Sequence, residues 1–143
     1  MRLPEQKLYD WLQRKVGHVA MLERVENRVG VSTPDLYFAS WRGPAVNGWI
    51  ELKCLERLPV RATTIVRLEN WTTGQRYWAL RHAAHGGRTW LMLQIQAKSI
   101  VLLVNAAKAA TAEWTRDEWL SNSITLNQRN ADADSILDAL RAT

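Results

Sequence analysis

The chain has 143 residues, 47% of them hydrophobic, and a formal charge of +5 at pH 7, so its length and composition predict a single domain over residues 1–143 with a continuous core. Cys54 is the single cysteine, which excludes an intrachain disulfide and a thiolate-rich zinc site. No apolar run approaches the ~20 residues that span a bilayer and MRLPEQKLYDWL lacks a signal peptide's apolar core, so we expect a soluble cytoplasmic protein without a membrane partner.

The N-terminal region predicts one helix and then two strands. Pro4 suits a first helical turn, and Leu8, Leu12 and Val16 recur at helical spacing, with Gly17 as a stop. These positions predict a helix over residues 4–16. Strands are then expected in HVAMLERVEN (residues 18–27) and DLYFASW (residues 35–41).

The next segment predicts a hairpin. RGPAVNG, residues 42–48, holds two glycines, a proline and an asparagine between two extended segments. Residues of this kind form turns, so WIELKCL (residues 49–55) is expected to return antiparallel to residues 35–41.

The C-terminal half predicts a helix, two central strands and further helices. Thr72, Thr73 and Gly74 open a helix that Gly86 and Gly87 end. TWLMLQIQ and SIVLLVN are apolar at nearly every position, which is typical of strands covered on both faces. A capping box at Thr115 and Glu118, and helical spacing of apolar residues, then predict helices packed on the sheet; the spaced residues are Ala133, Ile136, Leu137 and Leu140.

The order of elements defines the expected fold class. Helix, three strands, helix and two strands form an α/β core over residues 5–104, a mixed sheet flanked by helices. Residues 105–143 form a helical C-terminal extension.

Three polar side chains are expected to converge on the strand 49–55. The pleat has a period of two, so Glu51 and Lys53 share one face with Trp49. The hairpin brings Asp35 back toward Glu51. Two adjacent carboxylates repel unless one is protonated or a hard cation lies between them, and Mg²⁺ binds to carboxylates together with substrate phosphate. Such a site, with a lysine to orient or deprotonate water, is suited to phosphodiester hydrolysis.

Two simpler interpretations compete with this one. Asp35 can cap a turn, and Glu51 with Lys53 can form an ordinary ion pair on one strand face. Spacing alone does not separate these interpretations from a catalytic site.

The same residues resemble a known family. Pro34-Asp35 followed by Glu51-Leu52-Lys53 is similar to the PD-(D/E)xK pattern of a large nuclease superfamily. Gly30, PDLY, GWIELK and TTGQ together resemble the small virus-type replication-repair (VRR-NUC-like) nucleases, which include phage enzymes. The resemblance covers about residues 5–95 and implies a restriction-endonuclease-like fold. It also implies that Asp35, Glu51 and the main-chain carbonyl of Leu52 hold Mg²⁺, or Mn²⁺ in its place, while Lys53 acts on water.

The family adds a glutamate from the first helix and a glutamine from the helix after the hairpin. Glu5 fits the first position, one turn before Leu8 on the inward face, with Glu26 and Glu23 as rivals. Gln75 matches the second and could touch phosphate or support the site. Thr72 and Gln75 also have the spacing of a capping box, in which Gln75 serves only its own helix.

The charge distribution favours a polyanionic partner. Residues 53–88 hold seven Lys or Arg against two acids, whereas residues 106–143 hold four basic against six acidic residues. Candidates for phosphate binding are Arg28, Arg42, Arg57, Arg61, Arg67, Arg76 and Arg81. Most tryptophans lie in apolar patterns and are expected in the core. Trp41 and Trp71, beside turn residues, are expected to be exposed.

These features predict a Mg²⁺-dependent DNA endonuclease of a phage or its bacterial host, without an organic cofactor. By resemblance it acts on branched, junction or replication and repair intermediates, in the manner of a Holliday junction resolvase. A junction has near-symmetric arms, so a resolvase is expected to be a homodimer. The alternatives are a restriction-like or single-strand-trimming nuclease and an inactive nucleic-acid-binding module on the same fold.

Overall fold

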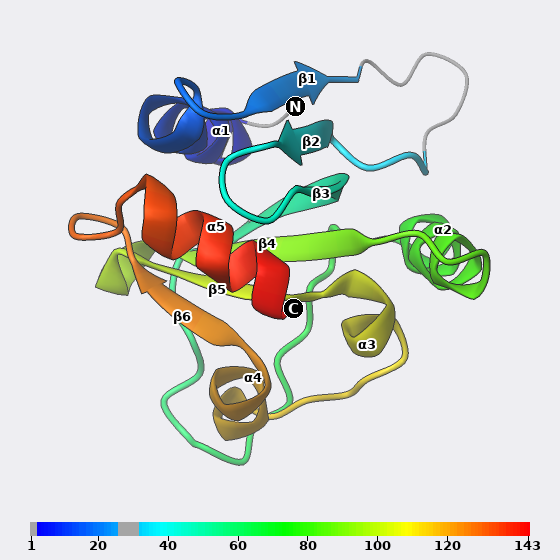
Figure 1. Ribbon diagram of the computed structural model, residues 1–143. Coiled ribbons are helices and arrows are strands. Elements are labelled where there is room, and N and C mark those ends of the chain that lie inside the picture. Colours follow the sequence, from blue (N-terminus) through cyan, green and yellow to red (C-terminus); the bar gives the residue numbers. More distant parts are fainter. Residues whose placement is uncertain (1–2, 26–31) are drawn as a thin grey trace.

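A computed structural model describes residues 3–25 and 32–143 as a six-stranded mixed sheet flanked by helices (Figure 1). The strands lie side by side in chain order, and each neighbouring pair is antiparallel except β3 and β4, which are parallel. Their bounds are β1 Met21–Arg24, β2 Leu36–Ser40, β3 Val46–Leu55, β4 Thr89–Ile95, β5 Ile100–Asn105 and β6 Ile124–Asn127. The mixed α/β architecture expected from the sequence is therefore confirmed.

One face of the sheet is covered by the first and last helices, α1 (Leu3–Val16) and α5 (Ala133–Ala142). The apolar stripe of α1, including Leu8 and Leu12, is buried as its spacing predicts. Both helices pack in one core with buried side chains of β2 to β6, among them Leu36, Ile50, Trp90 and Leu103. The predicted C-terminal helix thus packs on the sheet.

The opposite face is covered by α2 (Thr73–Ala84), α3 (Ala106–Ala110), α4 (Arg116–Asn122) and the long segment 56–72. This segment anchors itself in a second core through Leu58, Val66, Leu68 and Trp71. Side chains of β4 alternate between the two cores, with Trp90 and Met92 in the first and Leu91 and Leu93 in the second. The expectation that the two apolar strands are covered on both faces is confirmed.

The predicted hairpin is present, and its second strand, β3, extends beyond the end of its pairing with β2. Strands β2 and β3 are antiparallel, with Leu36 opposite Ile50 and Ser40 opposite Val46. Strand β3 then runs on through Leu55, where its pairing is with β4 only. The sheet therefore has an open step beside the last five residues of β3, which include Glu51, Leu52 and Lys53 of the predicted motif.

Three elements differ from the sequence predictions. The strand expected over residues 18–27 is formed only by Met21–Arg24 within the described residues, because residues 17–20 turn and the Val19 carbonyl accepts a hydrogen bond from Ser40 Oγ. Residues 26 and 27 lie outside the described part. Strand β6 was not predicted, so the C-terminal extension is not purely helical. The short helix α3 lies in the predicted helical extension, at a position that the sequence analysis did not single out.

No helix within residues 3–25 and 32–143 combines the length and the apolar character that a membrane crossing requires.

The packing of α5 generates a stability prediction. Leu137 is fully buried against the sheet, so Leu137→Ala is expected to lower the free energy of unfolding by about 2–5 kcal/mol through lost burial and a cavity. Asp138→Ala removes an exposed ion-pair partner of Arg141 on the same helix and is the control, with an expected change below about 1 kcal/mol. Urea unfolding measures both, and equal effects would contradict a structural role for α5.

Candidate active site

The site lies at the open step where β2 has ended and β3 continues. The main-chain N–H of Leu52 donates a 2.7 Å hydrogen bond to Asp35 Oδ2, from the residue just before β2. In an antiparallel ladder the N–H and C=O of one residue face the same neighbour. The Leu52 carbonyl therefore also faces the step, beside the Asp35 carboxylate.

Glu51 and Lys53 lie side by side on the face of β3 opposite to Ile50 and Leu52, as the pleat predicts. Both are buried, with 3% and 7% of their surface exposed. Lys53 Nζ lies 3.3 Å from Glu51 Oε1 and donates a 2.8 Å hydrogen bond to the carbonyl of Asn70. The ammonium is thus held between a carboxylate and the segment 56–72.

Glu5 approaches the same site from α1. It is buried at 8% exposure on the inward face of the helix, and its charge raises the pKa of both Asp35 and Glu51. Glu23 is exposed on β1, and Glu26 lies outside the described residues. Of the two described candidates for the fourth acidic residue, Glu5 is the one near the motif.

The carboxylates carry shifted pKa values because they are buried close to one another. Burial, with a further contribution from the charge of Asp35, raises the pKa of Glu51 to about 8 against the attraction of Lys53. Burial also raises the pKa of Asp35, although the hydrogen bond from Leu52 and the charge of Lys53 act in the opposite direction. Burial and mutual repulsion therefore disfavour the fully ionised state of the two carboxylates, even with Lys53 beside them.

One oxygen of the buried Glu51 carboxylate could hold a cation. Glu51 Oε1 is buried and receives no directed hydrogen bond from the described residues, although Lys53 is within ion-pair distance. Within residues 3–25 and 32–143, no three His, Cys, Asp or Glu side chains form a ready metal-binding group. Mg²⁺ does not need one, because it is bound through one or two carboxylates and otherwise keeps water or substrate oxygens. Asp35, Glu51 and the Leu52 carbonyl fit that requirement.

Gln75 is engaged in the structure by its own helix. Its N–H donates to Thr72 Oγ1 at 3.2 Å, and its Oε1 accepts from the Thr72 N–H at 3.0 Å. This is the capping box considered as the alternative for Gln75.

The arginines predicted to bind phosphate have different surroundings. Arg57, Arg61, Arg67 and Arg81 are exposed, and Arg57 pairs with Glu56. Arg76 is occupied within the protein, because its guanidinium donates to the carbonyls of Trp71 and Ala110 and stacks on the Trp71 ring. Arg28 lies outside the described residues.

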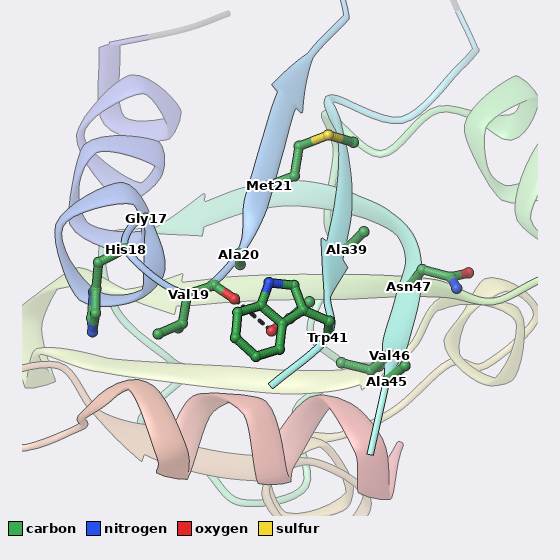
Figure 2. Close-up of a pocket in the computed structure, with 11 residues that line it drawn as sticks. Gly17, His18, Val19, Ala20, Met21, Ala39, Trp41, Ala45, Val46 and Asn47 are labelled. Atoms are coloured by element: carbon green, nitrogen blue, oxygen red, sulfur yellow. Dashed lines mark hydrogen bonds between the residues drawn. The ribbon is translucent and has the colours of Figure 1, made fainter. Parts of the chain in front are cut away.

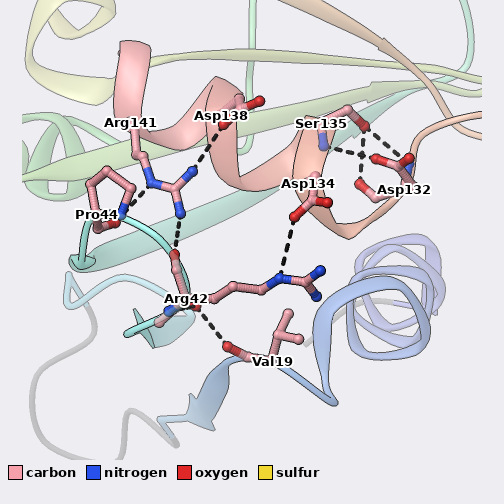
Figure 3. A network of polar contacts seen from close by, with 9 residues as sticks. Val19, Arg42, Pro44, Asp132, Asp134, Ser135, Asp138 and Arg141 are labelled. Atoms are coloured by element: carbon pink, nitrogen blue, oxygen red, sulfur yellow. Dashed lines mark hydrogen bonds and ion pairs between the residues drawn. The ribbon is translucent and has the colours of Figure 1, made fainter.

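Arg42 lies at the tip of the hairpin, at the other end of β2 from Asp35. It pairs with Asp134 of α5 at 3.4 Å, and its carbonyl accepts a hydrogen bond from Arg141 (Figure 3). The five residue steps from Val46 to Glu51 place about 17 Å of strand between the tip and the motif. Arg42 therefore fastens the hairpin to α5, far from Glu51.

Trp41 and Trp71 were both expected to be exposed, and only one prediction is confirmed. Trp41 is 84% exposed and lies over an open pocket of about 480 Å³ between the hairpin and residues 17–21 (Figure 2). The prediction for Trp71 is wrong, since it is 3% exposed. Its neighbouring turn residues belong to a segment that folds into the second core.

Asn70 contributes to the site in a way that the sequence did not indicate. Its main-chain carbonyl accepts the hydrogen bond from Lys53. Because any residue offers a carbonyl, no residue-type pattern could have identified it.

The sequence matches no known family model and no curated protein. The assignment of the site therefore rests on its residues and their geometry.

The raised pKa values of the carboxylates predict an unusual pH dependence of stability. A group with a folded-state pKa above its unfolded value binds more protons in the folded state, so stability falls as pH rises between the two values. For Glu51 this interval runs from 4.5 to about 8. In EDTA, we expect the free energy of unfolding to decline over this interval less steeply in Glu51→Gln than in the wild type.

The control is Glu56→Gln, which removes an exposed carboxylate and is expected to follow the wild-type curve. Urea unfolding at several pH values measures the slopes. Parallel curves for the wild type and Glu51→Gln would contradict the raised pKa of Glu51.

Proposed function

We propose that this protein is a Mg²⁺-dependent nuclease of PD-(D/E)xK type that hydrolyses phosphodiester bonds in DNA. The observation that carries the proposal is a buried Glu51 oxygen that lies 3.3 Å from Lys53 Nζ, next to the Asp35–Leu52 contact, and receives no directed hydrogen bond from the described residues. The order of α1, β1, β2, β3, α2 and β4, with β3 and β4 parallel, supports a restriction-endonuclease-like core.

Each group at the site then has a chemical role. Asp35, Glu51 and the Leu52 carbonyl would hold the cation, with Glu5 contributing directly or through water. The bound cation would supply Lewis acidity toward phosphate oxygens and water. Lys53 is fixed by the Asn70 carbonyl, so its ammonium can orient the attacking water and donate hydrogen bonds to the charge that develops on phosphate.

The distribution of positive charge supports DNA as the substrate. The exposed Arg57, Arg61, Arg67 and Arg81 belong to the cationic part of the chain, and contacts to phosphates give sequence-independent affinity. We propose branched or replication-derived DNA as the preferred substrate class, with a homodimer if junctions are resolved. A restriction-like or single-strand-trimming nuclease would use the same residues.

The decisive experiment is cleavage of end-labelled DNA in Mg²⁺. Duplex, single-stranded, flapped and four-way DNA, together with RNA, are incubated with the protein, and cleavage is expected to stop in EDTA. Lys53→Ala is expected to cut at least about 100-fold more slowly, since it removes the group that acts on water. The matched control is Lys98→Ala, an exposed lysine, which is expected to cut like the wild type.

Equal cleavage by Lys53→Ala and the wild type would refute the mechanism. If the wild type binds DNA and cuts none of the substrates with Mg²⁺ or Mn²⁺, the protein is instead a binding module on this fold.

Cation binding has a readout that does not depend on activity. At about 100 times its Kd, Mg²⁺ is expected to raise the free energy of unfolding by about 2.7 kcal/mol. The double variant Asp35→Asn, Glu51→Gln should lose this gain, whereas Glu56→Gln, Glu69→Gln, which removes two exposed carboxylates, should keep it. Urea unfolding with and without Mg²⁺ measures the gain, and the same gain in both double variants would place the cation elsewhere.

A further inference from the structure

A row of aromatic rings adjoins the candidate site on the same face of the sheet. Tyr37 on β2 lies directly opposite Trp49 on β3, and their ring centroids are 5.5 Å apart. The Trp49 ring contacts Trp78 of α2 at 5.8 Å, and Trp78 contacts His82 at 4.8 Å. His82 Nδ1 lies 2.8 Å from Thr89 Oγ1, which fixes the end of the row.

These rings are not ordinary core residues. Within the described part of the chain, Tyr37, Trp49 and Trp78 belong to neither hydrophobic core, and all four rings are half-buried. Three of the rings border an open pocket of about 360 Å³, which is lined by Tyr37, Trp49, His82, Arg88 and residues 45–48 and 86–87. Ring surface is therefore available to a ligand there.

The pocket is close to the proposed chemistry. Trp49 precedes Glu51 by two residues on the same strand face, a step of about 7 Å. That step is within the span of a few nucleotides, because even a stacked strand of duplex DNA advances about 3.4 Å per nucleotide. A nucleotide chain that crosses Glu51 and Lys53 can thus place a neighbouring base at the pocket.

The charge around the pocket suits a nucleic acid. Between Glu69 and Glu113 the sequence has no acidic residue, and this stretch contains Arg81, Arg88 and the whole of α2. Strand β2 and the hairpin turn that follows it are also free of acids, and Glu23 of β1, opposite Tyr37, is an exposed acid beside the row. Apart from Glu23, a polyanion therefore meets only positive or neutral side chains from these segments.

We propose that this pocket binds an unpaired nucleobase of single-stranded DNA by stacking, next to the phosphodiester that is cut. The proposal rests on the proposed nuclease function and makes it more specific. Only an unpaired base offers its face to a protein ring, whereas bases in a duplex are stacked on their neighbours. The pocket would thus select single-stranded segments, flaps or branch points over continuous duplex.

The test measures the Kd of the protein for a single-stranded oligonucleotide and for its duplex at a fixed salt concentration. EDTA is present to prevent cleavage. Trp49→Leu is expected to raise Kd for the single strand roughly tenfold, which corresponds to the loss of one stacked base. Duplex binding should change less than about twofold. Trp49→Phe keeps a ring and is expected to recover most of the affinity.

The matched control is Tyr77→Leu. Tyr77 is 62% exposed and lies beside Trp78 on α2, but it contacts Arg81 and is not in the row. Tyr77→Leu is expected to bind both DNA forms like the wild type. Far-ultraviolet circular dichroism and urea unfolding check that each variant is folded, and Tyr37→Leu replaces Trp49→Leu if the latter is not.

The outcomes separate this inference from the proposed function. The stacking pocket is refuted if Trp49→Leu weakens binding of single strand and duplex equally, or if it weakens neither. It is also refuted if the control Tyr77→Leu weakens binding of both forms equally. These outcomes count against the pocket even when the wild type cuts DNA. If single-strand binding falls as expected but the wild type never cuts, stacking stands and the nuclease proposal fails.

Discussion

The burial of Glu51 on a central strand is the constraint on which the site depends. An ionised carboxylate loses much of its hydration when it is buried, so it must be protonated or matched by positive charge. Its pKa of about 8 shows that the neighbouring Lys53 does not fully compensate for burial and for the charge of Asp35. A divalent cation would remove this imbalance, since it attracts both carboxylates at once.

The sheet makes room for this arrangement by ending one strand early. Pairing between β2 and β3 ends at Leu36 and Ile50, which leaves the Leu52 N–H without a partner strand on that side. The Asp35 carboxylate accepts a hydrogen bond from this N–H in place of a neighbouring strand. The same contact fixes the Asp35 carboxylate beside Glu51, so the end of β2 satisfies the backbone and also assembles the site.

The features that the sequence predicts well are local or periodic. The alternation of β3 places Glu51 and Lys53 on one face, and helical spacing from Leu8 turns Glu5 inward. The capping boxes at Thr72 and Thr115 also form, because each depends on residues three positions apart. Such patterns need no knowledge of the rest of the fold.

The features that the sequence does not predict depend on contacts between distant segments. Trp71 is buried because segment 56–72 folds onto β4 and β5, and Arg42 is tied to α5 by residues more than 90 positions away. Strand β6 has four residues and alternating burial at the sheet edge, too short a pattern to distinguish from a loop. The half-exposed state of Trp49 is likewise not predicted, because its own strand pattern is typical of a core residue.

The segment 56–72 connects the second core to Lys53, the proposed catalytic lysine. Arg76 holds Trp71 through its main-chain carbonyl and its ring, and the adjacent Asn70 carbonyl receives the Lys53 ammonium. Leu68 and Trp71 are buried on either side of Asn70, so the carbonyl cannot move far without disturbing the core. The position of Lys53 is therefore set by packing, which would keep its ammonium in place if the proposed cation bound to the Glu51 carboxylate. Arg76 contributes to the site by holding this segment, which is a structural role that differs from direct phosphate binding.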